Sequence, residues 1–379
     1  MVKNKKMINK GIATFGLDYG RCPRWLFERM VRLSKIIIYA IVDEQGPDEF
    51  IKRISDPVWF QSLGTVLAFD WNSSGLTTTL TAALKEAIRG SEKELGLFIC
   101  GGKGKTSLHT PNEIINWAEK IGMPESSANL LIYNSKMTAK VDNCLIQDGF
   151  TLYHHTFFFS QNGTWGVVQQ GMNIQLQSAR RYHWSSSRIE DLIQEPHAGI
   201  FSNIYMKEVL NMTARESKKN RETSIELISH GFNSLIKDIK LLEKYYTPFS
   251  KTVRLEKKNQ QLTLLHLENR EFYWHPVVRE IFLKSKYLER ILKLLCDQKI
   301  RSYEELLATP GVGPKTIRAL ALVGEVIYGA RPSYQDPARY SFAHGGKDAT
   351  PFHVNLQVYD QTISFLRSLI NKKKNKFHL

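Results

Sequence analysis

Hydrophobic residues recur at helical spacing in four long stretches of the chain. Residues 25–42, 79–89, 225–246 and 276–298 all carry apolar side chains three and four positions apart. This spacing predicts amphipathic helices, because such positions share one helix face. The first stretch ends in the apolar run 36–42, which is typical of a short buried strand. It is far too short to span a bilayer.

Aromatic and β-branched residues predict a β-hairpin in the middle of the chain. Residues 153–159 and 164–170 flank the sequence Ser160-Gln161-Asn162-Gly163, and Asn-Gly is a favoured hairpin turn. Residues 96–100 form another short apolar strand, which ends at Gly101-Gly102. From about residue 201 onward, the pattern is helical almost throughout.

This change of pattern predicts an α+β fold with two domains. We expect a mixed α/β domain at 1–198 and an all-α domain at 199–370, followed by a basic tail at 371–379. The boundary is placed in the segment Gln194-Glu-Pro-His-Ala-Gly199, which has loop composition. A chain of 379 residues is long enough to give each domain its own core.

Composition points to a polyanionic partner. The formal net charge is +15, and neutralising phosphates with lysine and arginine releases counterions and strengthens association. A lysine-rich surface that serves solubility is the alternative. The four cysteines have no CxxC spacing, so we expect no zinc site, iron–sulfur cluster or disulfide framework. No signal peptide or membrane span is apparent, which predicts a cytoplasmic protein without a membrane partner.

The most specific signal is a helix-hairpin-helix element at 303–325. Its centre is Pro310-Gly311-Val312-Gly313-Pro314-Lys315, between a short helix and a longer one. Two glycines leave the backbone bare, Pro314 suits the first helical turn, and amides at a helix N-terminus bind phosphate. The alternative is an ordinary helix–helix turn with a glycine cap. The expected DNA contacts are Gly311, Val312, Gly313, Lys315, Thr316 and Arg318.

Such a clamp reads the phosphate backbone, so DNA binding should depend on DNA structure rather than sequence. The hairpin also resembles that of the base-excision glycosylase superfamily. There, the resemblance implies a catalytic lysine at Lys315 and an aspartate about twenty residues later, near Asp336. Asp336-Pro337 is equally well explained as the start of a helix.

The first half carries the other candidate catalytic residues. They are Asp70, Lys140, Asp142, Asp148, His154 and His155. Asp142, Asp148 and His154 could together hold a divalent metal such as Mg²⁺ or Mn²⁺, or act as acid and base. His154 and His155 are adjacent on a strand, so they point to opposite faces and cannot both bind one ion. The second strand, 168–172, lacks the carboxylate that a PD-(D/E)xK nuclease needs.

Two further basic segments are candidate phosphate contacts. Gly101-Gly102-Lys103-Gly104-Lys105 follows a strand, and Lys103 and Lys105 could hold a phosphate beside bare amides, although the P-loop spacing fails. Arg180 and Arg181 precede aromatic residues, a combination that suits stacking on bases while holding phosphate. A solvated turn and a buried edge strand are the respective alternatives.

Several longer strings carry a family resemblance. They lie at 23–30, 55–61, 139–143, 152–155, 168–173 and 342–348. Together they resemble the uncharacterised archaeal and bacterial family called domain of unknown function 763. The resemblance covers nearly the whole chain, hairpin included. The family pattern reads Asp-Trp-His-Ser-Ser-Gly where this chain has Asn72, so a role for that histidine does not carry over.

Three classes of function remain open from the sequence. The first is a nuclease-type DNA repair enzyme that grips the backbone through the hairpin. The second is a base-excision glycosylase and AP lyase that uses Lys315 and Asp336. The third is a non-catalytic DNA-binding scaffold. The sequence leaves the oligomeric state open.

Overall fold

The computed structural model describes residues 22–67, 73–202, 204–246, 253–257, 260–264, 282 and 285–338. Asp70, Asn72, the string 342–348 and the tail 371–379 lie outside these residues. Within the described ranges, no helix combines the length and apolar character that crossing a bilayer requires.

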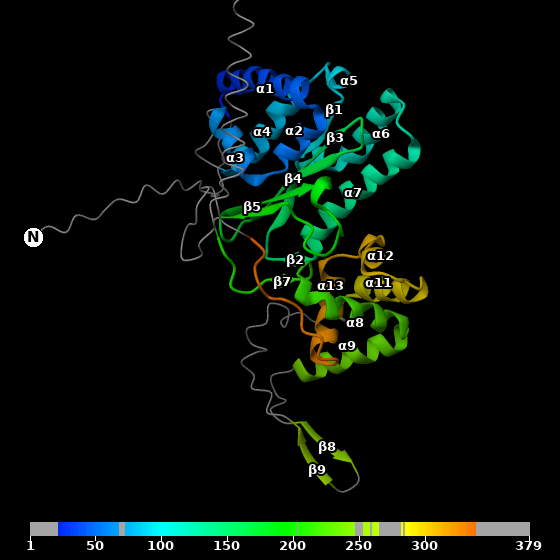
Figure 1. Cartoon of the computed structure of the whole chain (residues 1–379). Helices are drawn as coiled ribbons and strands as arrows, with labels where there is room; N and C mark the ends of the chain where they lie inside the picture. The colour runs from blue at the N-terminus through cyan, green and yellow to red at the C-terminus, as the bar shows by residue number, and fades with distance from the viewer. Residues whose placement is uncertain are drawn as a thin grey trace, which may run out of the picture.

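A five-stranded antiparallel sheet forms the centre of the first part of the molecule (Figure 1). Its strand order is β1-β3-β4-β5-β6, with β1 (Leu97–Lys103), β3 (Thr151–Ser160), β4 (Trp165–Asn173), β5 (Ser178–Ser185) and β6 (Gly199–Ser202). The predicted hairpin is β3–β4, with Phe159 opposite Trp165 and Gly163 at φ +85°. The Asn-Gly turn therefore formed as predicted.

Helices cover both faces of this sheet (Figure 1). One face packs against α1 (Arg24–Gln45), α2 (Pro47–Ile54), α3 (Pro57–Val66) and α4 (Ser73–Ala87), and the other against α6 (Thr110–Ile121) and α7 (Glu125–Cys144). The short α5 (Glu92–Leu95) precedes β1. Successive side chains of a strand point to opposite faces of the sheet, so they pack into two separate cores. Phe158 packs with α1–α4, while Phe157 and Phe159 pack with α6 and α7.

A group of helices follows the sheet in the chain. Its members are α8 (Lys218–Ser229), α9 (Phe232–Tyr246), α11 (Lys286–Asp297), α12 (Tyr303–Ala308) and α13 (Pro314–Val326). Their buried side chains belong to the same hydrophobic cluster as the α6–α7 face of the sheet. Small strands complete the fold: β2 (Ile146–Gln147) pairs with β7 (Leu210–Asn211), and β8 (Val253–Lys257) with β9 (Gln260–Leu264).

The α+β class is confirmed, but three local predictions were wrong. The run 36–42 is not a strand; it continues α1, where Ile38 and Ile41 are buried one turn apart. The helical stretch 225–246 is broken at Gly231, where φ is +89°. The boundary at 198/199 cuts the sheet, because β6 pairs with β5 and the first helix of the second part starts at Lys218.

Candidate functional site

A tight turn with two glycines joins α12 to α13, at the position where the sequence predicts a helix-hairpin-helix. Gly311 adopts φ +89°, a conformation that side chains rarely tolerate, while Gly313 is extended at φ −142° and caps α13. Val312 is buried between the helices. Pro314 is the first residue of α13, where its missing N–H costs no hydrogen bond.

The hairpin backbone is braced from α7 and α11. Lys140 Nζ donates to Leu307 O at 2.6 Å and to Thr309 O at 2.8 Å. Tyr287 Oη donates to Gly311 O at 3.1 Å. Burial lowers the pKa of Lys140. Lys140 was expected to be catalytic; instead, its ammonium group satisfies the last carbonyls of α12 and fixes the hairpin to the sheet domain.

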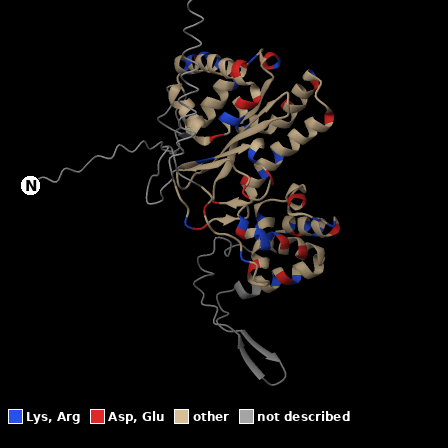
Figure 2. Cartoon of the chain, viewed as in Figure 1, with Lys and Arg blue, Asp and Glu red and all other residues tan. Residues whose placement is uncertain are grey.

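The residues predicted to contact DNA fall into two groups. Lys315 and Arg318 are half-buried, and Arg318 donates to Gln147 Oε1 at 3.3 Å. Thr316 and Val312 are buried in the core, so their side chains face away from any duplex. Exposed Tyr287 lies beside Gly311, with Arg290 5.2 Å from its ring centre. Acidic and basic residues are intermixed over the surrounding helices (Figure 2).

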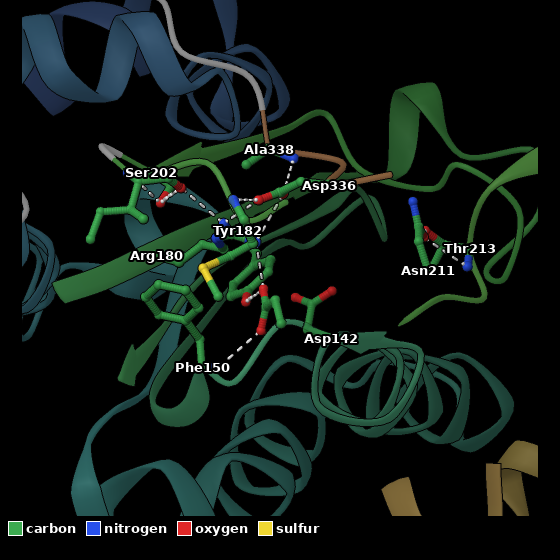
Figure 3. A network of polar contacts seen from close by, with 12 residues as sticks. Asp142, Phe150, Arg180, Tyr182, Ser202, Asn211, Thr213, Asp336 and Ala338 are labelled. Carbon is green, nitrogen blue, oxygen red and sulfur yellow. Dashed lines mark hydrogen bonds and ion pairs between the residues drawn. The ribbon is translucent and has the colours of Figure 1, made fainter. Parts of the chain in front are cut away.

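Arg180 forms the centre of a buried ionic network (Figure 3). Its guanidinium lies 2.6 Å from Asp148 Oδ2 and 2.8 Å from Asp336 Oδ2, with all three side chains fully buried. Asp336 also accepts from the backbone amides of Met206 at 2.7 Å and Ala338 at 2.8 Å. The network ties the segment after α13 to strand β5.

This network corrects three expectations. Arg180 cannot contact DNA, because its exposed fraction is 0%. Asp148 serves Arg180 and Tyr182, whose hydroxyl donates to Asp148 Oδ2 at 3.0 Å. Asp336 is a buried ion-pair partner that also caps the backbone, so the structure gives it no catalytic position beside Lys315. Burial raises the pKa of Asp148, and the Arg180 charge opposes that effect.

Arg181 is buried on the opposite face of β5. It donates to Gln61 Oε1 at 3.2 Å, Thr77 Oγ1 at 3.3 Å and His183 Nε2 at 2.9 Å. Burial lowers the pKa of Arg181 to about 9. The second predicted stacking arginine is therefore also a core residue, and the aromatic alternation around it is that of a buried strand.

His154 and His155 point to opposite faces, as predicted. His154 Nε2 lies 3.1 Å from Thr81 Oγ1 of α4, and His155 Nε2 lies 2.9 Å from Ser135 Oγ of α7. His155 Nδ1 is 2.7 Å from Gln169 Oε1. Burial lowers the pKa of both imidazoles, that of His154 to about 3. Both rings are therefore neutral at physiological pH.

The three expected metal ligands do not meet at one point. Asp142 accepts from Trp184 Nε1 at 3.0 Å and from Gln169 Nε2 on the α7 side, Asp148 binds Arg180, and His154 faces α4. Among the residues that the structure describes, no three acidic, histidine or cysteine side chains form a metal-binding group. The described side chains therefore do not assemble the Mg²⁺ or Mn²⁺ site expected from the sequence.

Asp142 instead pairs with a histidine that the sequence did not single out. His197 Nε2 hydrogen-bonds to Asp142 Oδ1, and its ring packs edge-on against Trp184 with centres 4.5 Å apart. His197 lines a pocket of about 540 Å³, together with residues of the 211–216 and 333–337 segments. A carboxylate that orients an imidazole at a pocket wall is a geometry suited to acid–base chemistry.

Sequence signals for His197 were weak. It lies in the loop Gln194-Glu-Pro-His-Ala-Gly199, which was interpreted as a domain boundary. Asp142 was selected as a metal ligand or acid–base group, but together with Asp148 and His154 rather than with His197. The two residues are far apart in sequence and meet because α7 and the loop after β5 both pack on the same face of the sheet.

Lys103 and Lys105 differ in their surroundings. Residues 101–103 belong to β1, and the following 3₁₀ turn covers Gly104–His109. Lys103 lines a cavity of about 470 Å³ together with His154, whereas Lys105 is exposed outside it. The predicted phosphate segment therefore borders a cavity, with one of its two lysines in the wall.

Comparison with known proteins identifies the family alone. The family model described as "Protein of unknown function (DUF763)" matches residues 11–354. No curated protein and no solved structure matches the chain significantly. The chemistry of the molecule must therefore be argued from its own residues.

Proposed function

Because the chain belongs to the DUF763 family, whose description carries no activity, we propose from its geometry that it is a DNA-binding, DNA-processing protein. The observation that supports this proposal is the hairpin between α12 and α13. Gly313 leaves the backbone before α13 uncovered, because a Cβ added there would meet no atom within 4 Å. A phosphate can approach that surface closely.

The hairpin offers the chemistry that a phosphate needs. An α-helix leaves its first-turn amides without partners inside the helix, and its dipole favours an anion there. Lys315 adds a positive charge in the same turn. The bracing by Lys140 and Tyr287 keeps the loop in place before DNA arrives. This preorganisation lowers the ordering cost of binding.

Gly313→Val is the sharpest test of this proposal. At Gly313 the backbone conformation suits any residue and the space is open, so the fold should keep its thermal stability. The isopropyl group would cover the path to the amides. We expect duplex DNA affinity to fall about tenfold at physiological salt in a fluorescence anisotropy titration, roughly the cost of one lost charge-assisted contact.

Lys315→Ala should also weaken binding, and it should reduce the slope of log K against log salt by about one charge. Lys93→Ala is the matched control, because Lys93 is exposed on the distant α5. Gly311→Val is a poorer test, since its Cβ would meet Ile291 Cδ1 at 2.5 Å. Unchanged DNA affinity in a correctly folded Gly313→Val protein would overturn the proposal.

A second candidate function is hydrolysis of a phosphodiester at the His197 pocket. The Asp142–His197 pair favours it. His197 would take a proton from water as the water oxygen bonds to phosphorus. The bond from phosphorus to the leaving sugar oxygen breaks, and that oxygen then receives the proton from His197. Asp142 would hold the imidazole in the orientation that both steps need.

His197→Asn tests this role directly. If the wild type cleaves DNA, the variant should lose at least about 100-fold in cleavage rate, the usual contribution of an acid–base group, while binding DNA normally. His109→Asn is the control, because His109 is exposed on the 3₁₀ turn. Assays with and without EDTA show whether a divalent ion takes part. Two results would contradict hydrolysis at this pocket: cleavage by His197→Asn at the wild-type rate, or no cleavage by the wild-type protein. Either result would leave DNA binding alone as the proposed function.

A further inference from the structure

A cavity beside α4 is separate from both sites described above. Its volume is about 470 Å³, and its wall combines the end of β1 with α4 and strand β3. It shares no lining residue with the His197 pocket and none with the hairpin. Pockets of this size commonly hold one small organic ligand.

The cavity wall is rich in cations. Lys85, Arg89 and Lys103 all line it. Lys85 is paired with Glu113 at 2.7 Å, and Arg89 with Glu86 at 2.7 Å. Lys103 forms no ion pair with any residue that the structure describes; its ammonium lies 6.0 Å from the centre of the Tyr153 ring. One positive charge in the wall therefore has no acidic counterpart, which favours an anionic ligand.

One side chain of the cavity wall carries a buried hydrogen-bonding atom without a partner. His154 is 1% exposed and lines the wall, and its Nδ1 has no hydrogen bond. Its Nε2 has two hydroxyl neighbours, Thr81 Oγ1 at 3.1 Å and Thr156 Oγ1 at 2.9 Å. Nδ1 is therefore the ring nitrogen that lacks a partner, and it donates or accepts according to the tautomer. Leaving such an atom unpaired is costly, which points to a ligand that hydrogen-bonds to it.

The cavity wall is also rich in hydroxyl groups. Thr78, Thr79, Thr81, Thr106 and Thr156 all line it. Hydroxyl and ammonium donors are the groups that coordinate phosphate oxygens. A carboxylate would use fewer of these donors than the three terminal oxygens of a phosphate.

We propose that this cavity binds a phosphomonoester. Lys103 pairs with the phosphate, and Nδ1 of His154 forms a hydrogen bond with a polar group of the same ligand. The phosphate can belong to a free nucleotide-sized molecule or to the 5′ end of a DNA strand. This inference concerns a site distinct from the hairpin, so it stands or fails independently of backbone binding there.

The first experiment uses inorganic phosphate and a nucleoside monophosphate, titrated by calorimetry into the full-length protein. We expect saturable binding that Lys103→Ala weakens at least tenfold. Lys105→Ala is the matched control, since Lys105 is exposed two residues away and does not line the cavity. Equal losses in both variants, or no saturable binding by the wild type, would overturn the proposal.

A second readout follows His154 itself by nitrogen NMR of the imidazole. A ligand that hydrogen-bonds to Nδ1 should shift the Nδ1 resonance, whereas a general salt effect should not. The shift should be absent in Lys103→Ala and present in Lys105→Ala. A bound phosphomonoester that leaves this resonance unmoved would contradict the assigned role of His154.

A third experiment asks whether the phosphate belongs to a DNA end or to a free small molecule. It uses the Gly313→Val protein, in which the hairpin should bind DNA less tightly. Tighter binding of a 5′-phosphorylated oligonucleotide than of its 5′-hydroxyl counterpart, lost on Lys103→Ala, would identify a DNA end. Nucleotide binding without that preference would identify a free small molecule. If the protein showed neither the preference for a 5′-phosphate nor nucleotide binding, this proposal would be wrong. That result would not affect the separate proposal of DNA binding at the hairpin.

Discussion

Arg180 lies fully buried between two carboxylates. Removing a guanidinium from water costs several kcal/mol unless its hydrogen bonds are replaced, and breaking one buried partner costs about 3–5 kcal/mol. Asp148 and Asp336 supply the replacement, from a loop after α7 and from the segment after α13. The three side chains therefore hold these segments together in the core, and their charges say nothing about a bound nucleic acid.

Buried histidines have a different consequence, which can be measured. Burial lowers the pKa of His154, His155 and His183, and His154 reaches about 3 from an ordinary value of 6.5. Below pH 6.5 the unfolded chain binds protons that the folded rings do not. The unfolded state is then favoured, and stability falls as the pH falls.

We therefore expect denaturant unfolding to show lower stability at pH 5 than at pH 7. The contribution of His154 should approach a slope of about 1.4 kcal/mol per pH unit as the pH falls well below 6.5. His154→Gln should remove that contribution, whereas His109→Gln, at an exposed position, should not. Stability that is constant or rises from pH 7 to pH 5 would contradict the neutral, buried state of these rings.

At the scale of elements, local signals succeeded where the chain itself decides the geometry. The β3–β4 turn formed as predicted, with Gly163 at positive φ, and the turn between α12 and α13 likewise has Gly311 at positive φ. The run 36–42 was predicted to be a strand because its apolar residues do not all lie on one face of a helix. It is helical because α1 packs against α2 and α4, where Ile38 and Ile41 reach the core.

The domain boundary shows the limit of such signals. The segment 194–199 has loop composition, yet β6 starts at Gly199 and extends the sheet. Strand pairing depends on the neighbouring strand, which a local pattern does not contain. His197 was overlooked for the same reason, since its partner Asp142 lies on α7, 55 positions earlier.

For the whole molecule, the distribution of charge along the chain matters more than its total. Residues 1–21 and 339–379 hold twelve of the 52 lysines and arginines, but three of the 37 acidic residues. The rest of the chain is closer to neutral, and Figure 2 shows both signs mixed over its helices. We therefore expect the terminal segments to carry much of the salt-dependent attraction to DNA.

The tail 371–379 provides the test, because four of its nine residues are lysines. Replacing Lys372, Lys373, Lys374 and Lys376 with glutamine should lower the slope of log K against log salt by up to about 3.6, at about 0.9 per contact. Replacing the same four with arginine keeps the charge and should leave the slope unchanged. An unchanged slope after the glutamine replacements would exclude the tail from the contact.

The sequence by itself determined the Asn-Gly turn, the α+β class and the family, because each depends on residues close together or on long strings. Tertiary structure alone decided which polar residues are accessible. From the sequence, four charged residues were expected to bind DNA or to act in catalysis: Arg180, Arg181, Asp148 and Asp336. In the structure all four are buried and form ion pairs or hydrogen bonds in the core. His197 and the cavity beside Lys103 appear only after the sheet brings α4, α7 and their loops together. Burial depends on what packs around a side chain, and distant segments supply that packing.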